Sequence, residues 1–411
     1  MRILFAHQGY LAQFKYLALA FARAGHEVIF MSAPVPGKLS GVKQVSYTLS
    51  QPAEASDPLL TDIVSALSYG RAARETAKRI RDEGFIPNVM VIHPGWGEGL
   101  FLRDVFPRAK MICFLEFFFS PEGNFFDFEG KPPDLDTRAQ LHMRNAPLLL
   151  ALNESAWNIS PTRWQKHLFP AVYQQRTTTI HEGVNIQKFV KRQGVEVETP
   201  NGIILRDGME IVTFVARHLE PVRGLNSFMR AADLITKNRP KAHIVVVGRE
   251  DGGYGVPPPS GTTHKEIMLR ELDLDLSRIH FFGCVDQSIV VKLLQLSKVH
   301  LFLTYPFLIS WSVLEAMSCS CVVLGSDTGP VREIINDGVN GLLIDFFDHA
   351  KFAELACQVL EKPERFAALG EAARQSIVDN FDALKNVKRQ MALVSAVASG
   401  LELPQEEIIH F

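Results

Sequence analysis

Residues 311–341, WSVLEAMSCSCVVLGSDTGPVREIINDGVNG, indicate the fold of this chain most directly. An apolar helical pattern that carries one carboxylate, Glu315, runs into a hydrophobic strand over residues 321–324. A turn of Gly, Asp, Ser and Pro follows, and a second helix is expected from Pro330 to Gly338. Such steps place backbone N–H groups at the carboxyl ends of strands, where α/β sheets bind anionic nucleotides. The stretch therefore predicts an α/β sheet with a nucleotide site at its edge.

The composition is typical of a two-domain globular protein. A chain of 411 residues is too long for one ordinary core. Its 47% hydrophobic and 21% charged residues are those of a soluble protein, and its net charge of −2 argues against a nucleic-acid partner. The N-terminus MRILFAHQGY enters a strand without a signal peptide, and no apolar run approaches the ~20 residues that span a bilayer. The five cysteines lie mostly in apolar runs, which favours buried thiols in a reducing compartment and a cytoplasmic protein.

The first half of the chain predicts a parallel sheet that opens with a βαβ unit. Residues 2–5 and 27–31 are expected to be strands, and the helix between them is expected to end at Gly25. Further strands are expected at residues 89–93, 110–115 and 148–152. Their apolar residues are continuous rather than alternating, which suits a parallel sheet covered on both faces.

A second alternation of strands and helices follows a polar stretch at about 190–209, which is interpreted as an interdomain connection. The second set of strands is expected at residues 211–216, 243–248, 279–282, 299–304, 321–324 and 341–344. The Gly- and Pro-rich loop at 249–264 follows one of these strands. It is interpreted either as a cover over a site or as a plain surface insertion.

Several motifs, in consistent order and spacing, resemble the GT-B glycosyltransferases of the family-4 type. The stretch 311–341 is similar to the family's EGFGLxxLEAMACGxPVVAsdxGGxxEii segment, and residues 180–189 are similar to its PNGVDxxxF link. Phe214-Val-Ala-Arg217 with Val222-Arg223-Gly224 resembles vGRlxxeKG, and Phe282-Gly283 resembles FlGxv. The resemblance implies two Rossmann-like, doubly wound α/β domains facing a cleft. It also implies that residues 1–190 form the acceptor-side domain, that residues 205–381 bind the nucleotide-sugar, and that a helix at about 382–411 crosses back onto the first domain.

The resemblance also implies an activity. A family member moves a sugar, with retention, from a UDP- or GDP-sugar to a glycan, a lipid-linked acceptor or a small molecule. It needs neither a metal nor another cofactor, and its partners are the nucleotide-sugar donor and a sugar-containing acceptor. Two alternatives stay open: a sugar-nucleotide epimerase or hydrolase of the same fold, and a catalytically silent sugar-nucleotide-binding protein.

By resemblance, the second domain supplies the donor site. Arg217 and Arg223 are the cations expected on the diphosphate, where arginine suits bidentate contacts, and Glu315 is expected on the ribose hydroxyls. The structural alternatives are that the arginines are ordinary surface residues and that the serine at the start of the helix is only an N-cap. Phe307 stands where the family's first glutamate is expected, which puts the donor sugar in doubt. The remaining donor-binding residues are expected to be Gly248, Val285, Ser310, Trp311, Ser312 and Val313.

The first domain carries three segments that resemble a subgroup of the family with an HQ…QF start and an HPGWGE turn. They are His7-Gln-Gly9-Tyr10, His93-Pro-Gly-Trp-Gly-Glu98 and Phe114-Leu-Glu116-Phe-Phe118, each after an expected strand. Carboxyl ends of strands face the ligand in doubly wound domains, so Glu116 and His93 are the catalytic candidates. Gly9 is expected to be a donor-binding residue, because it allows close approach of substrate. A structural carboxylate and a strand-end histidine are the alternatives.

Two further patterns are interpreted as structural. Asp273-Leu-Asp275 fits a metal-binding DxD, but it follows a helical pattern and is expected to be a helix-ending turn. A basic helix suits a weak peripheral contact with a membrane, yet interspersed acidic residues favour a solvated face; its cations are Arg71, Arg74, Lys78, Arg79 and Arg81.

Overall fold

The computed structural model describes residues 1–35, 37–49 and 55–403. They divide into two units, one formed by Met1–Gly183 with the C-terminal segment from Ala383, the other by Val184–Asp382. Within the described residues, no helix is both long and apolar enough to cross a membrane.

The first unit is built on a seven-stranded, all-parallel sheet with the strand order β3-β2-β1-β4-β5-β6-β7. Its strands are β1 (Arg2–Ala6), β2 (Glu27–Ser32), β3 (Val42–Ser46), β4 (Val89–Ile92), β5 (Lys110–Phe114), β6 (Trp157–Ser160) and β7 (Thr177–Thr179). Its longer helices are α1 (Lys15–Arg23), α2 (Thr61–Asp82), α4 (Leu135–Asn153) and α14 (Ala383–Ala398), and its short ones are α3 (Leu102–Val105), α5 (Arg163–His167) and α6 (Ala171–Gln174).

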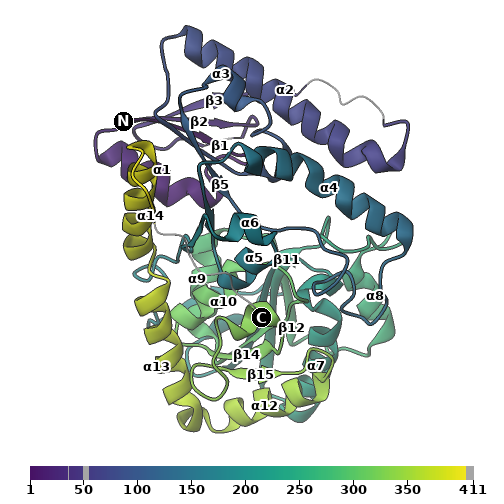
Figure 1. Cartoon of the computed structure of the whole chain (residues 1–411). Coiled ribbons are helices and arrows are strands. Elements are labelled where there is room, and N and C mark those ends of the chain that lie inside the picture. The colour runs from purple at the N-terminus through teal and green to yellow at the C-terminus, as the bar shows by residue number, and fades with distance from the viewer. Residues whose placement is uncertain (36, 50–54, 404–411) are drawn as a thin grey trace. The chain divides into compact units, whose positions relative to one another are not determined.

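Each face of this sheet has its own apolar core. Alternate residues such as Ile3 and Phe5 pack under α1 and α14, which lie side by side although they come from opposite ends of the chain (Figure 1). Their neighbours Leu4 and Ala6 pack under α2, α3 and α4. The continuous apolar runs are therefore explained by burial on both faces, as the sequence predicted.

One predicted strand of this unit is wrong, because residues 148–152 end helix α4. Leu148 and Leu152, four residues apart, are buried in the core under that helix, whereas Leu150 between them is 65% exposed. This one-sided burial is that of an amphipathic helix. The strand comes a few residues later, as β6.

The second unit holds a six-stranded parallel sheet with the order β12-β11-β10-β13-β14-β15. Its strands, all near their predicted positions, are β10 (Glu210–His218), β11 (Ala242–Arg249), β12 (Ile279–Gly283), β13 (Val299–Phe302), β14 (Val322–Ser326) and β15 (Leu342–Ile344). Its helices are α7 (Leu225–Asn238), α8 (His264–Glu271), α9 (Gln287–Leu296), α10 (Trp311–Ser318), α11 (Gly329–Arg332), α12 (His349–Glu361) and α13 (Pro363–Asn380).

Three local predictions need correction. The stretch 190–209 does not connect the units but forms a hairpin, β8 (Glu196–Glu198) and β9 (Ile204–Arg206), whose Val197 and Leu205 lie in the core of the second unit. The helix expected from Pro330 to Gly338 is the single turn α11, because the Asn340 side chain bonds the Asn336 N–H and the Ile334 carbonyl and holds a turn there. Cys284 is exposed, whereas Cys113, Cys319 and Cys321 are buried as expected.

Both sheets contain a switch point, which is the place in the sheet where the order of successive strands reverses its direction. It lies between β1 and β4 in the first unit and between β10 and β13 in the second. Ligands of doubly wound sheets bind at the carboxyl ends of the strands that flank such a point.

Candidate functional site

In the first unit, three titratable side chains follow neighbouring strands at the switch point. His7 comes directly after β1, His93 directly after β4, and Glu116 two residues after β5. The sheet therefore brings together side chains that lie more than a hundred positions apart in the sequence.

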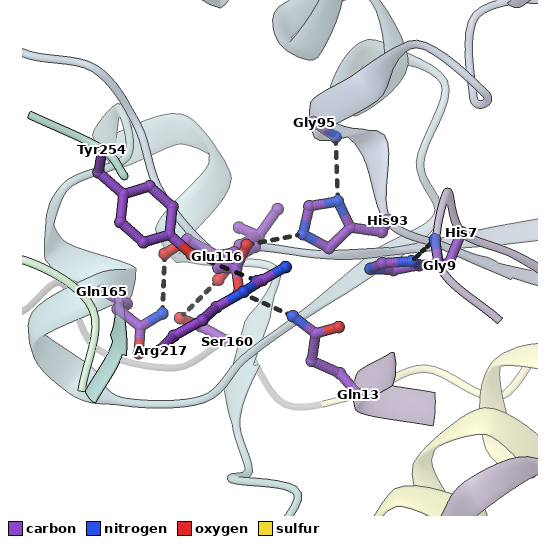
Figure 2. A network of polar contacts seen from close by, with 11 residues as sticks. His7, Gly9, Gln13, His93, Gly95, Glu116, Ser160, Gln165, Arg217 and Tyr254 are labelled. Carbon is purple, nitrogen blue, oxygen red and sulfur yellow. Dashed lines mark hydrogen bonds and ion pairs between the residues drawn. The ribbon is translucent and has the colours of Figure 1, made fainter. Parts of the chain in front are cut away.

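The Glu116 carboxylate is held by two donors (Figure 2). His93 Nε2 lies 3.1 Å from Oε2, and Gln13 Nε2 donates to Oε1 at 2.7 Å. His93 Nδ1 accepts the Gly95 N–H, so the ring proton resides on Nε2 and is donated to the carboxylate. The Glu116 backbone carbonyl accepts from Gln165 Nε2 at 2.8 Å, which fixes the main chain as well.

Protonation follows from these contacts. Burial raises the pKa of Glu116, but the hydrogen bonds from His93 and Gln13 with the nearby imidazoles outweigh burial and lower it below the usual range. Burial, reinforced by His93, lowers the pKa of His7 to about 3. His7 stays neutral, and its Nδ1 accepts the Gly9 N–H at 2.7 Å. The cluster thus presents one fixed carboxylate backed by imidazole.

Another carboxylate of the same motif has a structural environment. Glu98 is fully buried and accepts a hydrogen bond from the Tyr47 hydroxyl at 2.8 Å, and burial raises its pKa. This geometry anchors the turn of residues 94–98, which begins directly after His93.

The second unit places two arginines beside its own switch point. Arg217 lies near the end of β10 and is exposed, whereas Arg223 ends the short helix Pro221–Arg223 and is buried. Arg223 donates to the Leu308 carbonyl and to Thr304 Oγ1 in the loop after β13. Two guanidinium groups at such a place, of which that of Arg223 is buried and held by hydrogen bonds, can bind a diphosphate.

Glu315 lies on α10 with 9% of its surface exposed. It accepts one hydrogen bond from Gln287 Nε2 at 3.3 Å, and Lys188 Nζ donates to Gln287 Oε1. Burial raises the pKa of Glu315 to about 7, which the Gln287 contact and Lys188 only partly offset.

The start of α10 is capped by a serine. Ser310 is the N-cap, and its Oγ accepts from the Ser312 N–H at 3.3 Å and from Ser312 Oγ at 3.0 Å. Trp311 is 42% exposed, whereas Val313 is buried in the apolar core and Val285 packs against that core. The cap explains the serines, and the helix N-terminus still attracts an anion.

Gly248 has a packing reason to be glycine. A Cβ there would lie 2.6 Å from Leu219 Cδ2 and 2.8 Å from the Ala216 carbonyl. The close approach of the ends of β10 and β11 excludes any side chain at this position, with or without a ligand.

The aspartates at 273 and 275 follow α8, as expected. Asp275 accepts from the Ser277 N–H at 3.1 Å and from Arg278 Nε at 2.7 Å, so it stabilises the turn into β12. The cations of the helix at 71–81 are partly paired on the surface of α2, where Glu75 accepts from both Arg74 and Lys78.

Sequence reasoning missed three side chains at these clusters. Gln287 is the partner of Glu315, Tyr254 lies beside both arginines, and Glu220 holds the loop that carries Tyr254. Only the composition of the loop at 249–264 gave a signal, and it did not indicate which residue matters.

The two halves of the chain match two family models. Residues 24–189 match the model described as glycosyl transferase family 4 group, and residues 199–376 match the model described as glycosyl transferases group 1. Among curated proteins, N-acetyl-alpha-D-glucosaminyl L-malate synthase of Bacillus anthracis is 22% identical over 377 residues, 91% of this chain and 90% of that protein. Phosphatidyl-myo-inositol mannosyltransferase of Mycolicibacterium smegmatis is 27% identical over 268 residues, 57% of this chain and 64% of that protein.

Solved structures share the fold. HepE of Anabaena, crystallised with UDP-glucose, superposes with a TM-score of 0.70 at 16% identity and covers 97% of this chain and 100% of that one. Sucrose-phosphate synthase from Thermosynechococcus elongatus superposes with a TM-score of 0.74 at 15% identity, with 97% and 100% covered. These likenesses confirm the fold class that the sequence predicted, two Rossmann-like α/β domains.

Proposed function

Because this chain belongs to the GT-B glycosyltransferases of the family-4 type, we propose that it transfers a sugar from a UDP- or GDP-sugar to a sugar-containing acceptor with retention at the anomeric carbon. The acceptor is a glycan, a lipid-linked saccharide or a small molecule. The observation that carries the proposal is the pair Arg217 and Arg223 beside the switch point of the second sheet.

The chemistry of the leaving group explains the need for these cations. Cleavage of the sugar–diphosphate bond leaves negative charge on the phosphate and builds positive charge on the sugar. Fixed guanidinium groups and the N–H groups at the start of α10 neutralise the phosphate without a metal ion. In this proposal Arg217 and Arg223 bind the diphosphate, and Ser310–Ser312 backbone amides hold its distal end.

Glu315 and Glu116 have different parts in the proposal. Glu315, on the second unit, hydrogen-bonds the ribose hydroxyls, which give a buried carboxylate the partners it needs. Glu116, on the first unit, is ionised and fixed by Gln13 and His93, so it accepts a hydrogen bond from a substrate hydroxyl near the reacting carbon. His93 keeps that carboxylate oriented and anionic.

A donor panel tests the proposal. UDP-glucose is a natural first donor, because HepE, which shares this fold, was crystallised with it. UDP-N-acetylglucosamine and GDP-mannose complete the panel, each incubated with and without glycan, lipid-linked and small-molecule acceptors. Nucleotide release that depends on acceptor, together with a product whose anomeric configuration by NMR equals that of the donor, is expected.

The same panel separates the alternatives. Turnover of donor without acceptor supports an epimerase or hydrolase, and binding without turnover supports a silent protein; either outcome contradicts transfer. EDTA is expected to leave the rate unchanged. Loss of activity in EDTA with recovery by manganese would contradict the metal-independent mechanism and direct attention to Asp273 and Asp275.

A further inference from the structure

We propose that Tyr254 and Phe307 form an aromatic clamp that positions Arg223, and through the Tyr254 hydroxyl also Arg217, for the phosphates of the donor. The inference rests on the proposed function, since it concerns the same diphosphate site. It makes the two aromatic side chains positioning residues, which act through the arginines.

The clamp is defined by distances within the second unit. The Arg223 guanidinium carbon lies 4.9 Å from the centre of the Phe307 ring and 5.5 Å from the centre of the Tyr254 ring. The centres of the two rings are 4.8 Å apart, and the rings are tilted by 55°. The guanidinium N–H groups meanwhile donate to Thr304 and to the Leu308 carbonyl. The rings and the loop after β13 together fix the position of this cation.

The chemistry of the clamp suits a cation that must bind phosphate. An aromatic face attracts a guanidinium through its quadrupole but carries no net charge. A carboxylate in the same place, such as the glutamate that the family motif has at position 307, would cancel much of the charge of Arg223. Phe307 therefore contacts the arginine without bringing a negative charge of its own to the site.

Tyr254 links the two cations. Its hydroxyl accepts a hydrogen bond from Arg217 at 3.4 Å (Figure 2). Its ring lies beside Arg223. One side chain thus touches both arginines, which are six positions apart in the sequence.

The loop that carries Tyr254 is fastened to the segment that carries the arginines. Glu220, 1% exposed, accepts the Tyr254 and Gly255 N–H groups on Oε2 at 2.7 and 2.9 Å. His218 Nδ1 lies 2.6 Å from the Asp251 carbonyl. Gly253 has a φ of +143°, and a Cβ there would lie 2.6 Å from Glu220 Oε2, so glycine is required for this approach. Hydrogen bonds therefore connect the loop at 249–264 to the segment that carries the arginines, and the loop is not a plain surface insertion.

The test measures UDP affinity by calorimetry together with kcat and KM for the donor. Tyr254→Ala and Phe307→Leu are each expected to weaken UDP binding about fivefold to tenfold, because a cation–π contact in a partly desolvated place is lost. Tyr254→Phe keeps the ring and loses only the link to Arg217, so about a twofold loss is expected. Phe307→Tyr, which keeps the ring face, is expected to bind UDP like the wild type. Val256→Ala is the control, because Val256 is 84% exposed on the same loop.

A double-mutant cycle tests whether Tyr254 affects UDP binding through Arg223. If Tyr254 acts through Arg223, Tyr254→Ala adds little to the loss already caused by Arg223→Ala. Additive losses, or unchanged UDP affinity in both Tyr254→Ala and Phe307→Leu, overturn the clamp. If Phe307→Leu does not fold, the half-exposed Tyr254 decides the matter alone. A wild-type protein that binds no nucleoside diphosphate contradicts the proposed function itself, which is a different result from an unchanged affinity in the variants.

Discussion

Among single residues, hydrogen-bond donors decide how a buried carboxylate behaves. Glu116 receives donors from Gln13 and His93, and its pKa lies below the usual range despite burial. Glu315 receives one neutral amide, from Gln287, and burial raises its pKa to about 7. Near neutral pH Glu116 is therefore ionised, whereas Glu315 titrates there.

Arg217→Ala is expected to lower kcat/KM for the donor at least tenfold, because one charge-assisted phosphate contact is worth ~1.5–3 kcal/mol. Arg217 is exposed, so its loss is expected to leave the melting temperature unchanged. Steady-state kinetics and thermal melts check both statements. Arg206→Ala is the matched control, since Arg206 is also exposed and lies on β9. Full activity of Arg217→Ala would contradict the site assignment.

Glu315→Gln is expected to gain stability relative to the wild type as pH rises. The ordinary pKa of 4.5 applies to the unfolded chain and about 7 to the folded one. Between these values the unfolded chain ionises first, so the wild type loses stability up to pH 7 and the loss is constant above it. The neutral glutamine does not titrate, and the gain between pH 5 and pH 8 is expected to reach about 2–3 kcal/mol.

Denaturant unfolding of both proteins at pH 5, 6.5 and 8 measures this gain. Glu371→Gln serves as the control, because Glu371 is exposed on α13 of the same unit. A stability difference that does not depend on pH would show that Glu315 titrates normally.

Among the elements, segments at the borders of the two units complete their cores. Helix α14 closes the face of the first sheet that α1 begins to cover, with Val387 and Val394 in the shared core (Figure 1). The hairpin of β8 and β9 adds Val197 and Leu205 to the core of the second unit. The segments that border the division of the chain therefore contribute to its cores and are not mere connections.

Val394→Ala is expected to destabilise the first unit by about 2 kcal/mol, since it removes buried methyl groups and leaves a cavity. Val394 is fully buried, whereas Lys388 on the same helix is exposed and gives the control Lys388→Ala. Urea unfolding, monitored with a spectroscopic probe in each unit, measures the change in the free energy of unfolding. Equal stability of the two variants would mean that α14 is not an integral part of this core.

For the whole molecule, local periodicity predicted most strands, but neither the strand order that sets the switch points nor the contacts between remote segments. Leu148 and Leu152 fit a short strand as well as a helix until their one-sided burial is seen. The resemblance to the family motifs indicated the two arginines and Glu315, because each stands at a position that matches a motif residue. Tyr254 and Gln287 could not be predicted, since their partners lie 28 to 37 positions away and only the fold brings them together.

The last prediction follows from the assignment of different proposed roles to the two units. The residues proposed to bind the nucleoside diphosphate all belong to the unit Val184–Asp382, and the His93–Glu116 pair belongs to the other. Glu116→Gln is therefore expected to keep UDP affinity within about twofold of the wild type and to lower kcat by about tenfold to a hundredfold. Loss of the negative charge removes the strong, charge-assisted hydrogen bond that we propose to a substrate hydroxyl.

Calorimetry with UDP and steady-state kinetics with the active donor separate the two effects of Glu116→Gln. Glu75→Gln is the control, since Glu75 is a half-exposed carboxylate paired with Arg74 and Lys78 on α2 of the same unit. Because glutamine has the shape of glutamate and can still accept from Gln13, an unchanged fold is expected by thermal melting. A variant that turns over like the wild type would remove Glu116 from the reaction. A variant that loses UDP binding and turnover together would place the carboxylate in the nucleotide site, contrary to the assignment of donor binding to the second unit.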